Sequence, residues 1–249
     1  MPLPPDAFRH HPGLAGMIQD PETSFFRDFM PEDVDERMRE MGRPADWRYS
    51  DATREANRRA ALAGRMDRDL WVFAYGSLMW DPALLFDEVR RATVIGHSRG
   101  MVLYDTFGAR GSPGAPGVMA GLVGGGSCEG VAFRIPAETV DRETEILWRR
   151  EMIAHCYIPA FRPARTAAGD IEVLGFVADP TAEMIRLDLT RAEIVRAAAT
   201  GEGIRGTSYD YLKNMLDHFA ALRIEDPELS ALLAEVDRYR ADTSGQQSP

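Results

Sequence analysis

A short strand that ends at a glycine most constrains the fold of this chain. Residues 71–75 are aromatic, β-branched or small, which predicts a buried strand, and Gly76 follows directly. Because glycine takes backbone angles closed to other residues, the chain can turn sharply here. Such a turn can present the amides of Ser77 and Leu78 to an anion. The sequence therefore predicts a binding turn at the end of a rigid strand.

Short apolar runs alternate with glycine-rich breaks from residue 70 onwards. Six runs are predicted as strands: 70–75, 92–96, 101–104, 118–123, 130–135 and 171–177. The segment 108–117 holds so many glycines and prolines that it is predicted as a loop. Because the strands precede most of the helices in this part of the chain, the pattern indicates an α+β fold with a closed or strongly curved sheet.

Helical patterns flank these strands. They cover residues 31–41, 51–66, 136–153, 208–222 and 227–240, and a capping box at Thr190 and Glu193 starts one more helix. Residues 1–68 are interpreted as a helical extension packed on the domain that follows, a mobile appendage being the alternative. The main domain is expected at 69–242, and 243–249 is expected to be a disordered tail.

Charge and hydropathy narrow the function classes. The chain of 249 residues is 45% hydrophobic and 27% charged, which is ordinary for a soluble globular protein. Its net charge of -10 argues against an extended nucleic-acid surface, which needs clustered lysine and arginine. No apolar run approaches the roughly 20 residues that span a bilayer, and the N-terminus lacks the pattern of a signal peptide. We expect no membrane contact and a cytoplasmic location.

Two cysteines, Cys128 and Cys156, are too few for a disulfide framework and fit a reducing compartment. We expect both to be inert core residues. The five histidines have no ligand spacing such as HExxH, so no metal site is expected.

Glu151 falls on the apolar face of the predicted helix 136–153. Val140, Thr144, Leu147 and Glu151 follow one another at helical spacing and form one narrow stripe. A carboxylate among apolar groups favours its neutral form and becomes a better base, so Glu151 is a candidate general acid/base. The alternative is a structural ion pair with an arginine such as Arg99 or Arg134.

These features together resemble the ChaC-type γ-glutamylcyclotransferase family over residues 71 to about 222, well over half the chain. The resemblance rests on Tyr75-Gly76-Ser77-Leu78-Met79-Trp80, Gly96-His97-Ser98-Arg99, Arg110-Gly111-Ser112-Pro113, Gly130-Val131-Ala132-Phe133-Arg134, Leu147-Trp148-Arg149-Arg150-Glu151-Met152, and Gly206 followed by Tyr211-Leu212. Each piece is short, but their order and spacing are specific to the family.

The resemblance implies a small mixed β-barrel wrapped by helices and an enzyme that acts on glutathione without a cofactor. In this reaction the α-amine of the γ-glutamyl group attacks its own γ-carbonyl, so that 5-oxoproline forms and Cys-Gly leaves. Glu151 suits the acid/base role. The backbone amides of the turn from Tyr75 to Leu78 suit either the developing oxyanion or the substrate α-carboxylate, and the sequence does not distinguish the two.

Several candidate substrate-binding residues have a structural alternative. Tyr75 either contacts substrate or ends a core strand, and Tyr211 is either a site residue or a core aromatic. Arg99 and Arg110 either bind a glutathione carboxylate or form structural pairs. Ser77 resembles a hydrolase nucleophile in its place after a strand, but Gly-x-Ser-x-Gly is absent, so its hydroxyl is expected to hold the turn or the substrate.

The chain departs from the family pattern at three places. His97 stands where tyrosine is frequent, Ser208 stands where an asparagine precedes the Tyr-Leu pair, and His155-Cys156-Tyr157 replaces a glycine-rich segment. These departures affect the expected substrate more than the reaction. Other γ-glutamyl amino acids, γ-glutamylamines, or a non-catalytic γ-glutamyl-binding module are therefore the alternative functions. The oligomeric state is not evident from the sequence.

Overall fold

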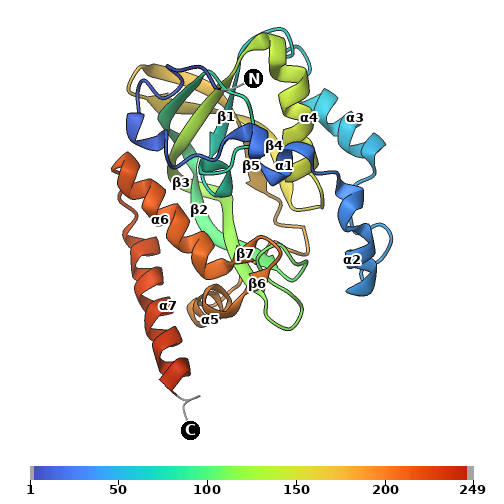
Figure 1. Ribbon diagram of the computed structural model, residues 1–249, viewed down its shortest axis with the longest axis vertical. Helices are drawn as coiled ribbons and strands as arrows, with labels where there is room; N and C mark the ends of the chain where they lie inside the picture. The colour runs from blue at the N-terminus through green and yellow to red at the C-terminus, as the bar shows by residue number, and fades with distance from the viewer. Residues whose placement is uncertain (1–2, 246–249) are drawn as a thin grey trace.

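A closed five-stranded barrel forms the centre of the computed structural model, which describes residues 3–245 (Figure 1). The strands are β1 Leu70–Ala74, β2 Glu88–Asp105, β3 Gly117–Ile135, β4 Tyr157–Thr166 and β5 Gly169–Ala178. They are ordered β1-β3-β2-β4-β5, and parallel pairing of β1 with β5 closes the ring. The α+β class and the closed sheet predicted from the sequence are confirmed.

The long hairpin of β2 and β3 corrects the predicted strand count. Segments 92–96 and 101–104 belong to one strand, as do 118–123 and 130–135, and the predicted loop 108–117 lies between the two strands. Glycines inside both strands interrupt the apolar pattern, and a register shift between Ile95 and His97 breaks the alternation. A β-bulge of this kind changes which face of the sheet the following side chains occupy. The alternation of apolar and polar residues breaks there, so a prediction from periodicity splits one strand into two.

Strand β4 was missed in the sequence. It contains Pro159 and Pro163, which argue against a central strand. Its ladder to β5 runs the full length, whereas β2 pairs with it only at Arg165 and Ala164. Pro159 and Pro163 therefore have a partner strand on one side only. A residue that lacks an amide hydrogen is tolerated at such positions.

Helices cover the barrel on two sides (Figure 1). They are α1 Phe25–Asp28, α2 Asp35–Glu40, α3 Asp51–Ala61, α4 Val140–Glu151, α5 Arg191–Thr200, α6 Ser208–Leu222 and α7 Pro227–Gly245. Short 3-10 turns occupy Pro12–Leu14, Pro21–Thr23, Pro31–Val34, Ser77–Met79 and Ala137–Thr139, and β6 Glu202–Gly203 pairs with β7 Gly206–Thr207. Within residues 3–245, none of the helices has the length and apolarity to cross a bilayer.

Helix ends differ from the prediction at three places. Helix α3 ends at Ala61 rather than near 66, and α4 begins at Val140 after a 3-10 turn. Helix α7 continues to Gly245, so residues 243–245 of the expected tail are helical, while 246–249 lie outside the described residues. The capping box at Thr190 and the helix 208–222 are confirmed.

The described part of the N-terminal extension packs against the barrel and α4. Arg27 forms a buried pair with Glu143, and Arg58 donates to Thr144 Oγ1 at 2.8 Å. The indole of Trp148 donates to Asn57 Oδ1 at 2.9 Å. The helices of the extension therefore share a buried interface with the helix that ends at Glu151.

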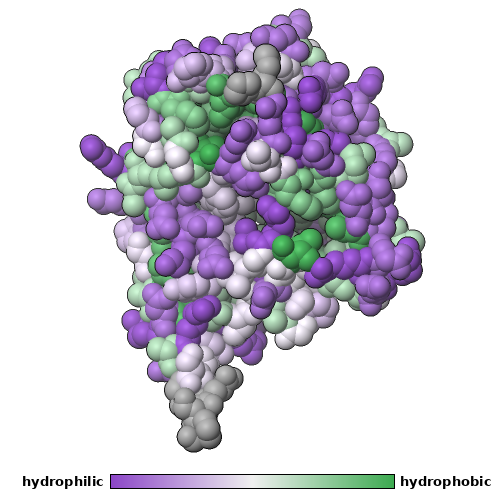
Figure 2. Space-filling model, in the orientation of Figure 1, coloured by the Kyte–Doolittle hydropathy of each residue, from purple (hydrophilic) through white to green (hydrophobic). Residues whose placement is uncertain are grey.

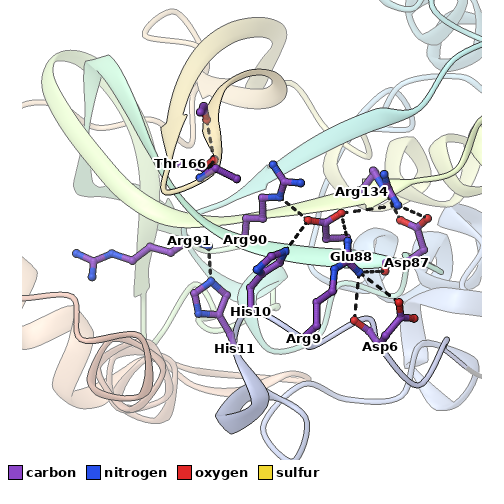
Figure 3. A network of polar contacts seen from close by, with 12 residues as sticks. Asp6, Arg9, His10, His11, Asp87, Glu88, Arg90, Arg91, Arg134 and Thr166 are labelled. Atoms are coloured by element: carbon purple, nitrogen blue, oxygen red, sulfur yellow. Dashed lines mark hydrogen bonds and ion pairs between the residues drawn. The ribbon is translucent and has the colours of Figure 1, made fainter.

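The start of the extension is held by charges along β2 (Figure 3). The Glu88 side chain is 1% exposed, and Arg9, His10 and Arg90 bind its carboxylate. Burial by itself raises the pKa of Glu88, but Arg90, Arg9 and Arg134 outweigh it and hold the pKa below its usual value. His11 accepts a hydrogen bond from the Arg91 amide at 2.8 Å, so the segment is tied to the strand by backbone and side chain.

Candidate active site

Glu151 is the last residue of α4 and carries its carboxylate toward the barrel. The expected stripe is present, because Val140, Thr144 and Leu147 are buried and the Glu151 side chain is only 13% exposed. The helix packs against the strands through Trp148, whose ring lies 5.3 Å from that of Phe176. Packing of the apolar face thus aims the carboxylate inward.

A small cavity of about 40 Å³ lies in front of Glu151. Its lining is the glycine turn, three tyrosines and apolar barrel residues: Tyr75, Gly76, Ser77, Leu78, Met119, Ala120, Glu151, Tyr157, Phe176 and Tyr211. Burial raises the pKa of Glu151 above its ordinary value, and the neighbouring Arg150 partly opposes that rise. The last turn of a helix also disfavours negative charge. Glu151 is therefore a carboxyl group that accepts protons more readily than an exposed glutamate.

Arg150 is the ionic partner of Glu151. Its Nε lies 2.9 Å from Glu151 Oε1, and its other nitrogens donate to the Asp81 carbonyl and, at 3.0 Å, to Ser77 Oγ. The ion pair with an arginine that the sequence left as the alternative is therefore present, but the two partners suggested for it are wrong. Arg99 pairs with Asp226, and Arg134 pairs with Asp87. Arg150 stands beside Glu151 in the sequence motif, but helical periodicity does not predict that its guanidinium pairs with that carboxylate.

The predicted turn after β1 is present at Gly76, but Gly76 has φ of -140°, so the turn does not use the left-handed angles that favour glycine. Ser77–Met79 form a 3-10 turn, closed by a bond from the Met79 amide to the Gly76 carbonyl at 2.8 Å. A Cβ atom at Gly76 would lie 2.6 Å from Tyr211 Oη, so only glycine fits at this approach. The first amides of a helical turn have no acceptor within it, which leaves those of Ser77 and Leu78 available to a ligand.

Three tyrosines enclose Glu151. Tyr75 donates to the Phe176 carbonyl at 2.8 Å, and Tyr211 Oη accepts from the Ala120 amide at 3.2 Å. Tyr157 lies in β4, the strand missed in the sequence. Burial raises the pKa of all three phenols, so they remain neutral hydroxyls beside the carboxyl group.

The family model for ChaC-like proteins matches residues 70–239. This range includes the barrel, the glycine turn and Glu151. The chain belongs to the ChaC-like family.

Relatives of this ChaC-like protein carry a specific name. The Escherichia coli (strain K12) protein named glutathione-specific gamma-glutamylcyclotransferase is 37% identical over 197 residues, which cover 78% of this chain and 84% of that protein. The Homo sapiens protein named glutathione-specific gamma-glutamylcyclotransferase 1 is 28% identical over 174 residues, which cover 67% of this chain and 78% of that protein.

A solved structure supports the fold. The yeast gamma-glutamyl cyclotransferase specific to glutathione superposes with a TM-score of 0.63 at 21% identity, covering 70% of this chain and 97% of that one. At this identity the likeness concerns the fold alone, and it agrees with the barrel described above.

Arg99 lies behind the glycine turn of this ChaC-like barrel and not in the lining of the cavity. Its guanidinium donates to the Tyr75 carbonyl at 2.8 Å, to the Glu129 carbonyl and to Asp226 at 3.0 Å. This placement favours the structural alternative over direct contact with substrate. Arg99 supports the residue that precedes the turn.

Arg110 also lies outside that lining. Its guanidinium is 5.8 Å from the Tyr211 ring, and Thr207 accepts a long bond of 3.5 Å. In the described part of the chain no carboxylate pairs with it. Asp105 fixes the surrounding loop by accepting bonds from several amides, including that of Gly111 at 2.9 Å. Arg110 therefore borders the site through Tyr211.

The family departures occupy different places. Ser208 Oγ accepts from the Val118 amide at 2.9 Å and donates to the Arg110 carbonyl at 3.2 Å, so it joins β3 to the loop. His97 lies on β2 away from the cavity, whereas Tyr157 lines it. Both cysteines are free and buried. No three His, Cys, Asp or Glu side chains gather as metal ligands within residues 3–245.

Proposed function

We propose that this ChaC-like protein is a glutathione-specific γ-glutamylcyclotransferase that forms 5-oxoproline and releases Cys-Gly. Two findings support the proposal: the E. coli relative of that name at 37% identity, and a buried glutamate that faces a small cavity beside a glycine turn. The single observation that carries the mechanism is the position of Glu151, enclosed and of raised pKa at the cavity wall.

Glu151 moves the proton in this reaction. The α-amine of a free γ-glutamyl group is largely protonated at neutral pH and reacts after it loses one proton to solvent. Its lone pair attacks the γ-carbonyl carbon, and the Glu151 carboxylate takes a second proton from that nitrogen as the new C–N bond forms. The C–N bond to the cysteine nitrogen then breaks, and the leaving nitrogen receives the proton from Glu151. One carboxyl group acts as base and then as acid, which a pKa nearer neutrality suits.

The turn supplies donors for negative charge. The Ser77 and Leu78 amides stabilise either the oxyanion of the tetrahedral intermediate or the substrate α-carboxylate. Ser77 Oγ is held by Arg150, and its role is to orient the turn rather than to attack the substrate. Tyr75, Tyr157 and Tyr211 present uncharged walls that keep water away from the carboxyl group.

Confinement supplies much of the rate. Nucleophile and electrophile belong to the same γ-glutamyl group, so the protein needs only to hold the rotamer that brings them together. The cavity before Glu151 measures about 40 Å³, and its walls are the surfaces available to hold this rotamer. The mechanism uses neither a cofactor nor a metal ion.

The expected setting is the cytoplasm, where two free thiols persist and where reduced glutathione is plentiful. Glutathione is the partner, and the net charge of -10 gives no support to a nucleic-acid partner. The alternative substrates are other γ-glutamyl amino acids and γ-glutamylamines. A binding module without catalysis does not account for a buried base at the cavity wall.

Product analysis tests the proposal. Purified protein is incubated with glutathione, γ-glutamylalanine and a γ-glutamylamine, and 5-oxoproline is measured by mass spectrometry. We expect 5-oxoproline and Cys-Gly from glutathione at a rate well above the other two. Comparable rates for all three would remove the glutathione specificity, and no product from any of them would favour the binding module.

A further inference from the structure

A second, larger cavity opens beside the one at Glu151. It measures about 210 Å³ and shares Ser77, Met119, Glu151 and Tyr157 with the small cavity. The γ-glutamyl group that reacts must lie in the small cavity, against the carboxyl group. The group attached to its γ-nitrogen must then extend into this second cavity, which we call the outer chamber.

The N-terminal extension builds one wall of the outer chamber. Phe25, Phe26 and Phe29 form a cluster with ring centroids 5.2–6.1 Å apart, and Val34 and Met38 continue the wall. All of these residues precede the family match, which begins at residue 70. Figure 2 shows hydrophobic surface between α1, α2 and the β6–β7 hairpin on this face.

The barrel side of the chamber is apolar as well. Leu103, Phe107, Met119 and Met184 line it, and Ile204 stands on the turn between β6 and β7 with 45% of its surface exposed. A cysteine thiol is small and needs little of this apolar surface. The lining suits a larger apolar group joined to the sulfur.

Two arginines supply charge at the same chamber. Arg150 and Arg205 stack on Phe26 at 4.1 and 4.8 Å, and Arg205 reaches Asp81 at 3.2 Å. The Arg205 side chain is 27% exposed, so it keeps donors toward solvent. Both guanidiniums already pair with a carboxylate, that of Arg150 with Glu151 and that of Arg205 with Asp81. The carboxylate on the leaving half of a γ-glutamyl tripeptide would therefore share the partly exposed Arg205 with Asp81.

We propose that the outer chamber is a subsite for S-substituted glutathione, in which an alkyl or aryl group on the sulfur packs against the wall made by the N-terminal extension. This inference rests on the proposed function. The bonds made and broken are unchanged: 5-oxoproline forms, and S-substituted Cys-Gly leaves. The extension is then a determinant of substrate choice added to the family barrel.

A substrate series tests this subsite. The value of kcat/KM is measured for glutathione and for S-methyl, S-propyl and S-hexyl glutathione. Burial of each added methylene is worth up to about a fourfold gain, so kcat/KM is expected to rise along the series. A fall along the series, with glutathione still turned over, overturns the subsite and leaves the proposed function intact. Turnover of neither glutathione nor the S-substituted compounds contradicts both.

Matched variants locate the subsite. Ile204→Trp fills the mouth of the chamber and is expected to lower kcat/KM for S-hexyl glutathione at least about tenfold more than for glutathione. Ile158→Trp is the control, since Ile158 is 47% exposed and lies outside both cavities. Phe25→Ala, at an exposed position of the extension, is expected to reduce the S-hexyl to glutathione ratio about threefold. An unchanged ratio in Phe25→Ala overturns the role of the extension, even if Ile204→Trp fails to fold.

Discussion

Helix α4 carries two glutamates that point away from bulk solvent, Glu143 and the partly exposed Glu151, and they have opposite surroundings. Glu143 is fully buried, and its two oxygens accept bonds from both Arg27 nitrogens and from the Leu85 amide at 2.8 Å. Among residues 3–245, Glu151 has one ionic partner, Arg150, and it faces a cavity. Burial alone therefore does not mark a catalytic carboxylate.

The difference lies in hydrogen-bond saturation. A carboxylate whose two oxygens both bind buried donors has no oxygen turned toward a substrate, and its removal leaves a buried cation unpaired. A carboxylate with an open side keeps its chemistry available. Glu143 accordingly fixes the extension to the helix, whereas Glu151 is available for proton transfer.

The largest expected effect is on catalysis at Glu151. Glu151→Gln keeps the shape but removes the base, and the rate of 5-oxoproline formation is expected to fall about 10²- to 10⁴-fold. Initial rates are compared with those of Glu145→Gln, an exposed position on the same helix. A rate within tenfold of the parent protein would remove Glu151 as the base.

Glu143→Gln is expected to give the opposite result. It leaves Arg27 without its ionic partner, and the free energy of unfolding is expected to fall by about 3 kcal/mol. The rate per folded molecule should stay within about twofold of the parent rate. Urea unfolding measures the first quantity and active-site-normalised assays the second. If activity drops while stability is unchanged, the contrast between the two glutamates is wrong.

The space before Glu151 depends on the close approach of Gly76 to Tyr211. Gly76→Ala places a methyl group 2.6 Å from Tyr211 Oη, and we expect a loss of about 10- to 100-fold in kcat/KM. Adding Tyr211→Phe removes the clashing oxygen, so the double variant should recover part of the loss relative to Gly76→Ala. Losses that simply add would show that the two residues act separately.

The smallest effect concerns pH. Glu151 must be deprotonated to act as base, so kcat/KM falls as pH drops through its raised pKa. Arg150 lowers that pKa, and Arg150→Met should therefore move the acidic limb of the pH profile to higher pH. Arg149→Met is the control on the same helix. If the acidic limb of the kcat/KM profile moved to lower pH in Arg150→Met, the ion pair between Arg150 and Glu151 would not be what lowers the pKa of Glu151.

Much of the site follows from local sequence patterns. Helical spacing from Val140 to Glu151 predicted the inward carboxylate, and the strand followed by Gly76 predicted the turn. Both depend on short stretches of chain, where the period of apolar residues and the end of a strand are informative. The reason for a glycine at position 76, the close approach of Tyr211, is a contact between distant segments.

The remaining parts depend on contacts between distant segments. Arg99 and Arg150 look alike in the sequence, and only the packing of Asp226 and of the turn distinguishes them. Tyr157 was named only as a departure next to Glu151, because its strand contains prolines. The aromatic wall of residues 25–29 has no strong period, and its role appears only where it meets the barrel.

The most direct test is the reaction of the parent protein with glutathione in H₂¹⁸O, followed by mass spectrometry. Attack by the substrate's own amine involves no water, so 5-oxoproline without ¹⁸O and an equal amount of Cys-Gly are expected. Glutamate carrying ¹⁸O would show that water attacks the γ-carbonyl, and it would contradict proton transfer by Glu151 in an intramolecular cyclisation.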